Sequence, residues 1–193
     1  MPSRRDQAAS TRARVIAIAR EMFASAGYAQ TSIEAIQERA ALSRGALYHH
    51  FANKRELFLA VYELIEDETA EKLASAAAKA PADPLRAGCA AWLELASDPT
   101  TRQITLIDAP AVLGWERWSA TDDREGLGLL RQALIREADA GRLDPELVDG
   151  VAHILLAALI ELGLMIARAD KPRAAQRQAR ATLDYLLTRL VGL

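Results

Sequence analysis

The stretch Leu42–Lys54, LSRGALYHHFANK, spaces its apolar residues as a helix does, but two features weaken that helix. Gly45 falls in the expected first turn, where a glycine costs about 1 kcal/mol relative to alanine. Tyr48, His49 and His50 then crowd the far end with polar and aromatic groups. We therefore expect a partner outside the chain to complete the exposed face of this helix.

The preceding segments are also helical by pattern. Apolar residues line one face of a helix from about Ser10, and Gly27 is expected to end it. Thr31, with Glu34 three residues later, predicts the capping box of a second helix. Only RAALS separates that helix from the next, which is the length of the helix-turn-helix connection. In that unit the second helix enters the major groove of DNA.

Ser43 is the expected N-cap of the third helix, and Asn53 is that of a long fourth helix. Arginine can bind a guanine edge bidentately, whereas hydroxyl, imidazole and ammonium groups bind phosphate oxygens. Glycine lets the backbone approach DNA closely. The residues with this chemistry are Ser43, Arg44, Gly45, Tyr48, His50 and Lys54. Two alternatives stay open, because Gly45 could serve a tight helix crossing and Tyr48 could be a half-buried aromatic residue.

Charge is divided unevenly along the 193 residues. Residues 1–60 hold nine Lys/Arg and five Asp/Glu, whereas the remainder holds fifteen and twenty-one. Because residues 1–60 are basic and the remainder is acidic, we expect a polyanionic partner for residues 1–60. Cys89 is the single cysteine, so one chain can form no disulfide and no cysteine-based metal site. Adjacent histidines on a helix point about 100° apart, and we expect no metal at His49 and His50.

Almost every later segment also has helical periodicity, and no hairpin or repeat signal occurs. The sequence predicts an all-α fold of about nine helices, with residues 109–128 as its least regular part. The long apolar run at residues 151–169 contains His153 and Glu161, which favours a buried helix over a membrane span. A cytoplasmic protein without a membrane partner is expected.

Residues Thr31–Val61, TSIEAIQERAALSRGALYHHFANKRELFLAV, resemble the DNA-binding signature of the TetR family of bacterial transcriptional regulators. The resemblance extends over residues 10–62. It implies an Ω-shaped homodimer with an N-terminal DNA-binding domain, residues 1–55, and a helical ligand-binding and dimerisation domain, residues 56–193. The DNA contacts that it implies are Thr31, Ser43, Arg44, Gly45, Tyr48, His49, His50 and Lys54.

We expect the last two long helices to form the dimer interface. The first of them carries small residues that allow close approach, and the second carries a leucine stripe, so that two such pairs could form a four-helix bundle. The predicted interface residues are Ala157, Ala158, Gly163, Leu183, Leu186, Leu187 and Leu190. The alternative is that the stripe packs only within the protomer.

Scarce polar groups and tryptophans in apolar surroundings suggest a ligand cavity. Its predicted residues are Trp92, Asp108, Trp115, Trp118, His153 and Glu161. The alternative is that the tryptophans only pack and that Glu161 pairs across the dimer.

The function predicted from the sequence is a homodimeric repressor that a small molecule releases from a palindromic double-stranded DNA operator. A ligand-independent architectural DNA-binding protein is the alternative, and a helical enzyme is a more distant one. The sequence has no G-x-S-x-G, P-loop, H-E-x-x-H or complete dinucleotide motif. We therefore expect no enzyme, no cofactor and no metal.

Overall fold

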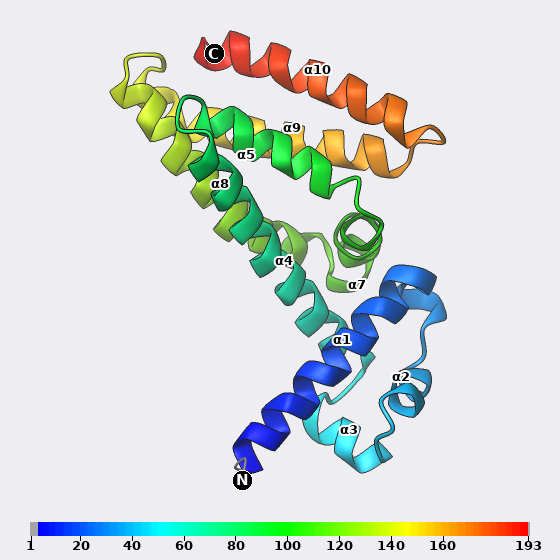
Figure 1. Ribbon diagram of the computed structural model, residues 1–193. Coiled ribbons are helices and arrows are strands. Elements are labelled where there is room, and N and C mark those ends of the chain that lie inside the picture. Colours follow the sequence, from blue (N-terminus) through cyan, green and yellow to red (C-terminus); the bar gives the residue numbers. More distant parts are fainter. Residues whose placement is uncertain (1–3, 193) are drawn as a thin grey trace. The chain divides into compact units, whose positions relative to one another are not determined.

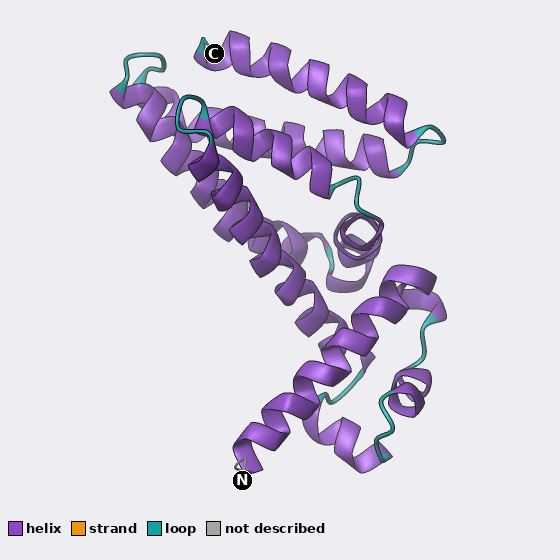
Figure 2. Cartoon of the chain, viewed as in Figure 1, coloured by secondary structure: helices purple, strands orange, loops and turns teal. Residues whose placement is uncertain are grey.

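The computed structural model describes residues 4–192, apart from the side chains of residues 4 and 115–125. Over this range the chain forms only helices and the turns between them (Figure 2), which confirms the predicted all-α class. The chain divides into two compact units. The first comprises Met1–Glu66 and Pro99–Gly114, and the second comprises Asp67–Asp98 and Trp115–Leu193.

The first unit contains the helix-turn-helix (Figure 1). Its elements are α1 (Arg4–Gln30), α2 (Ile33–Arg39), α3 (Arg44–His50), the beginning of α4 (Lys54–Lys79), α6 (Pro99–Thr101), the π-helix η1 (Arg102–Asp108) and α7 (Ala109–Leu113). Helix α1 begins earlier than predicted. It breaks at the expected glycine, since Gly27 has φ 78° and ψ 164°, a conformation that glycine adopts without strain.

The helix caps agree with the sequence at two of three positions. The Ser43 side chain accepts the N–H of Ala46, and Asn53 Oδ1 accepts that of Glu56 at 2.9 Å. The predicted Thr31 cap is wrong by one residue. Ser32 has the extended backbone of an N-cap, and its hydroxyl accepts the N–H of Ala35 at 3.0 Å.

An aromatic cluster forms the core beneath the helix-turn-helix. The Phe58 ring from α4 meets Phe23 edge-on at 5.3 Å and Tyr28 at 5.1 Å between centroids. Leu47 of α3 is fully buried, and Phe51, which follows α3, is nearly so. These two residues hold one side of α3 inward, as their spacing predicts, and leave the opposite side for a partner.

The second unit is a bundle around α9. Its elements are the remainder of α4, α5 (Pro84–Leu95), α8 (Trp115–Asp139), the 3₁₀ turn η2 (Pro145–Leu147), α9 (Val148–Ala167) and α10 (Pro172–Val191). Helices α5, α8 and α10 all pack on α9 (Figure 1). Trp92 of α5 is buried, and its Nε1 donates to the Leu159 carbonyl of α9 at 3.0 Å.

Residues 109–128, predicted to be irregular, are helical except for one break. Pro110 lies in the first turn of α7, where its missing N–H removes no helical hydrogen bond. Gly114, with φ 84°, separates α7 from α8. Gly126 and Gly128 lie within α8. Single glycines weaken a helix without ending it, so the glycine count overstated the irregularity of this segment.

Helix α9 is a long, strongly apolar helix. Residues Pro145–Ala167 are long and apolar enough to cross a membrane by composition, with a mean hydropathy of 2.1 over the relevant window. Only 39% of that window is buried, and Ile154 is 59% exposed. The prediction of a buried helix therefore holds for one face of α9 only.

Candidate nucleic-acid interface

The turn between α2 and α3 sets the position of the recognition helix. Ala41 adopts a left-handed φ of 50°. The N–H of Leu42 returns to the Gln37 carbonyl at 3.2 Å. These local bonds, with the buried Leu47, fix α3 against the rest of the unit. The side chains on its other face are therefore presented from a rigid support.

The outward face of α3 carries the predicted contact groups. Ser43, Arg44, Gly45 and His49 are exposed, and Tyr48 is 37% exposed. The Arg44 guanidinium lies 5.5 Å above the Tyr48 ring, a cation–π contact that orients both side chains. This face therefore offers the exposed Arg44 cation and several hydrogen-bonding groups to a partner.

No contact within the chain explains why position 45 is a glycine. A Cβ placed there would meet no atom within 4 Å, and the residue lies inside a regular helix. The alternative of a tight helix crossing is therefore excluded. The chain tolerates a cost of about 1 kcal/mol at a position where only an external partner would approach the backbone.

Two of the predicted DNA contacts, Lys54 and Thr31, have partners within the chain. Lys54 Nζ donates to the carbonyl oxygens of Tyr28 and Thr31, each at 2.8 Å, and lies 4.0 Å from the centre of the Tyr28 ring. Thr31 is buried, and its hydroxyl donates to the Gly27 carbonyl at 2.8 Å. Since an ammonium has three N–H groups, Lys54 uses two to hold the end of α1 against the start of α4. Its partners lie 23 and 26 residues away, so no local pattern identifies them.

The remaining contacts lie at the C-terminal end of α3. The His49 and His50 rings meet edge-on at 5.4 Å, and His50 is half-buried beside Phe51. The exposed Arg12 of α1 lies 5.1 Å above the Phe51 ring. Arg12 was not predicted as a contact, although the basic N-terminal segment was visible in the sequence.

The segment 99–114 belongs to the same unit as the helix-turn-helix. Asp108 Oδ2 accepts the N–H of Tyr28 at 2.8 Å. Arg55, in the first turn of α4, donates to the carbonyl oxygens of Val112 at 3.0 Å and Leu113 at 3.2 Å. Burial raises the pKa of the Tyr28 phenol, and the Arg55 charge opposes that rise. Asp108, one of the predicted ligand residues, thus binds the end of α1.

The described residues do not gather the other predicted ligand residues into one cavity. Trp92 is buried between α5 and α9, in a different unit from Asp108. His153 and Glu161 are exposed on α9 within the protomer. Trp115 and Trp118 lie outside the described side chains.

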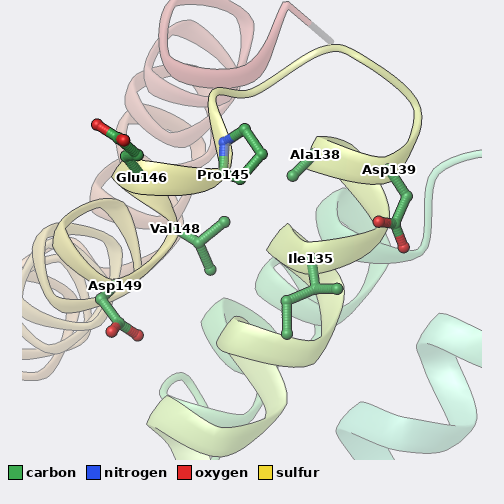
Figure 3. Close-up of a pocket in the computed structure, with 7 residues that line it drawn as sticks. All are labelled: Ile135, Ala138, Asp139, Pro145, Glu146, Val148 and Asp149. Atoms are coloured by element: carbon green, nitrogen blue, oxygen red, sulfur yellow. The ribbon is translucent and has the colours of Figure 1, made fainter.

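A hollow of about 280 Å³ lies between the end of α8 and the start of α9 (Figure 3). It is lined by Ile135, Ala138, Asp139, Pro145, Glu146, Val148 and Asp149. Arg131 of α8 bonds Asp149 of α9 at 2.8 Å. The hollow contains none of the predicted ligand residues, and its volume falls below the roughly 300–1,000 Å³ of most ligand pockets.

The predicted dimer residues separate into two groups by burial. Gly163, Leu183 and Leu187 are buried within the protomer, Ala158, Leu186 and Leu190 are half-buried, and Ala157 is exposed. Within the leucine stripe of α10, Leu183 and Leu187 therefore belong to the protomer core, whereas Leu186 and Leu190 stay partly open. In this pair of helices, α9 is open around Ala157, and α10 exposes Tyr185, which is 62% exposed.

Comparison with known proteins identifies both parts of the chain. Residues 15–61 match the family described as bacterial regulatory proteins, tetR family, and residues 82–190 match the tetracyclin repressor-like C-terminal domain. The regulator TtgR of Pseudomonas putida is 35% identical over 159 residues, covering 74% of each protein.

Solved structures agree with the sequence comparison. A TetR-family regulator from Pectobacterium atrosepticum superimposes with a TM-score of 0.87 at 33% identity, over 98% of both chains. SmeT in complex with triclosan gives 0.73 at 28% identity, over 94% of this chain and 92% of that one. SmeT is described as the repressor of the Stenotrophomonas maltophilia multidrug efflux pump SmeDEF. The helix-turn-helix, the C-terminal body and these likenesses together show that the chain belongs to the TetR family of bacterial DNA-binding transcriptional regulators.

Proposed function

We propose that the protein is a homodimeric repressor that binds a palindromic operator and leaves it when a small molecule binds. The observation that carries DNA binding is Gly45, which weakens an exposed helix where the chain itself has no atom within 4 Å. A DNA backbone or base edge at this position explains the absence of a side chain. The site of action is the cytoplasm, where bacterial DNA lies.

The exposed face of α3 supplies the proposed contacts. Arg44 is the base-reading residue, since a guanidinium can bind guanine bidentately. Ser43, Tyr48 and His49 bind phosphate oxygens. We add Arg12 as a further phosphate contact, because it is exposed beside the C-terminal end of α3. The half-buried His50 contributes at the edge of the same face.

Lys54 and Thr31 have a supporting role in this proposal. Their side chains join the end of α1 to the starts of α2 and α4. The bonds fix the framework that presents α3. Their loss would weaken binding to every DNA sequence alike, without removing a phosphate contact.

Two observations support the homodimer and the effector. The apolar face of α9 that the protomer leaves uncovered needs a partner. A homodimer with two-fold symmetry also matches the symmetry of a palindromic DNA site. Segment 99–114 is bonded to α1 through Asp108 and to α4 through Arg55. A ligand that displaces this segment would therefore move the supports of α3. Because SmeT is solved with triclosan, we propose an apolar aromatic effector here.

The test is selection of bound sequences from random double-stranded DNA, followed by affinity measurements over a range of salt concentrations. We expect a palindromic site and a linear fall of log affinity with log salt. Arg44→Ala should cost about 1–3 kcal/mol and relax one position of the site. Arg177→Ala, an exposed residue of α10, is the matched control. Equal affinity of Arg44→Ala and wild type for the selected site would contradict the docking.

The effector is tested separately on the selected operator. Apolar aromatic compounds are screened for release of DNA and for a change in tryptophan fluorescence. A coupling of about 1–3 kcal/mol would appear as a roughly 5–150-fold loss of operator affinity. A full screen without a releasing compound would remove the ligand response and leave DNA binding intact.

A further inference from the structure

The uncovered face of α9 has a symmetric arrangement of residues. At about 100° per residue, the residues on this face are Gly150, His153, Ile154, Ala157, Glu161 and Leu164. All of them are exposed except the half-buried Leu164. Ala157 lies at the centre and is small enough to let another helix approach closely.

His153 and Glu161 stand four residues before and after Ala157. The helix rises about 1.5 Å per residue, so each lies about 6 Å from the centre along the axis. The three residues form one i±4 ridge. When i±4 ridges of two helices interdigitate, which is the commonest packing class, the helices cross at about −50°. In an antiparallel pair, a two-fold axis at Ala157 then brings position 153 of one ridge beside position 161 of the other.

We propose that His153 binds Glu161 of the partner subunit, and that the two-fold axis of the homodimer passes beside Ala157. The pair occurs twice in an isologous interface. An imidazole N–H donates to a carboxylate oxygen in each. This inference rests on the proposed homodimer and specifies how its subunits meet.

Charge favours a second copy of the chain over other occupants of this face. A bilayer would have to cover Glu161, which is costly for a carboxylate. A second α9 in the stated arrangement supplies a complementary group to both polar residues. The charge nearest to His153 along its own helix is Asp149, which already bonds Arg131. His153 therefore has an acceptor to gain from the partner.

A charge exchange tests the arrangement by sedimentation equilibrium at low salt. His153→Glu places two carboxylates together at each pair, and we expect the dimer to weaken by roughly tenfold or more. Glu161→Lys removes the acceptor and should weaken it also. The double variant His153→Glu/Glu161→Lys again pairs opposite charges and should recover most of the affinity. Lys72→Glu, an exposed residue of α4, is the matched control.

An Ala157→Cys variant tests the axis directly. A disulfide needs Cα atoms about 4.4–6.8 Å apart, so rapid cross-linking under mild oxidation is expected if the axis passes beside position 157. The native Cys89 is buried, and the exposed Ala74→Cys on α4 is the control.

The outcomes separate this inference from the proposed homodimer. A double variant weaker than either single variant would show that each residue faces its own copy, which overturns the arrangement. Single variants as tight as wild type, or no cross-link at position 157, would also overturn it while the dimer stands. A monomeric wild-type protein, on and off DNA, would remove the proposed homodimer itself.

Discussion

The Asp108 carboxylate accepts the backbone N–H of Tyr28 at 2.8 Å, across 80 residues of sequence. The bond forms at the break in α1, where the conformation of Gly27 turns the chain out of regular helix. A Cβ on Gly27 would lie 3.2 Å from Gln103 Nε2. Segment 99–114 thus closes tightly over the break, and side chains of that segment help to hold the end of α1.

Replacing Asp108 should lower both the stability of the protein and the release of operator by an effector. Asp108→Ala leaves a partly buried N–H without its acceptor, which costs about 1–3 kcal/mol of unfolding free energy. It should also reduce the release of operator by an effector. Asp108→Asn retains an acceptor and should cost less. Urea unfolding and operator release measure the two effects, with the exposed Asp67→Ala as control. An unchanged unfolding midpoint in Asp108→Ala would contradict the role.

Gly45→Ala should separate stability from DNA binding. The added Cβ meets no atom of the chain, so α3 should gain up to about 1 kcal/mol. Operator affinity should nevertheless fall, because the methyl group lies where DNA approaches. Thermal unfolding and operator titration report the two quantities. Gly128→Ala in α8, where a Cβ is equally free of contacts, should leave operator affinity unchanged. Undiminished affinity in Gly45→Ala would remove the close approach.

The sequence predicted the N-caps and the buried side of α3 well, because these features depend on residues that are close together in the chain. The N-caps Ser43 and Asn53 bond N–H groups three residues ahead, and the inward Leu47 follows from helical spacing. The capping box failed by one residue. Thr31 and Ser32 are both good N-caps by type, and the choice is made by the bond of Thr31 to Gly27 in α1.

Long-range contacts could not be predicted from the same patterns. Asp108 binds a backbone group 80 residues away, so composition alone suggested a ligand residue. Leu183 and Leu187 form a stripe that would suit either a dimer or a core, and both are buried in the protomer. The polar residues of α9 look buried in an apolar sequence, yet Glu161 is exposed. Which face of a helix is covered depends on the packing of several helices.

Lys54→Ala should act on the framework and spare the electrostatic contacts. Losing its bonds to the Tyr28 and Thr31 carbonyls should lower the unfolding free energy by about 1–3 kcal/mol. The slope of log affinity against log salt should stay as in wild type, since no phosphate contact is lost. Arg12→Ala should instead lower that slope by about one for each half-site. A reduced slope in a folded Lys54→Ala dimer would return Lys54 to the DNA contacts.

Cys89 should be unreactive in the folded protein and should make stability depend on alkaline pH. Burial raises the pKa of its thiol to about 12, from an ordinary 9.0. The folded state therefore favours the neutral thiol. The stability that this provides is fully present below pH 9 and is lost as pH rises from 9 toward about 12. The slope approaches about 1.4 kcal/mol per pH unit.

Two measurements check the Cys89 prediction. An aromatic disulfide reagent at about pH 8, below the ordinary thiol pKa, should label the thiol only on unfolding. Cys89→Ala leaves a small cavity, so the comparison with wild type uses the pH dependence of stability and not its absolute value. Urea unfolding between about pH 8 and pH 10 should show a steeper loss in wild type than in Cys89→Ala. All other ionisable groups are common to the two proteins, so the difference between the two curves reports on Cys89. Parallel curves, or rapid labelling of the folded protein, would show that the thiol reaches solvent.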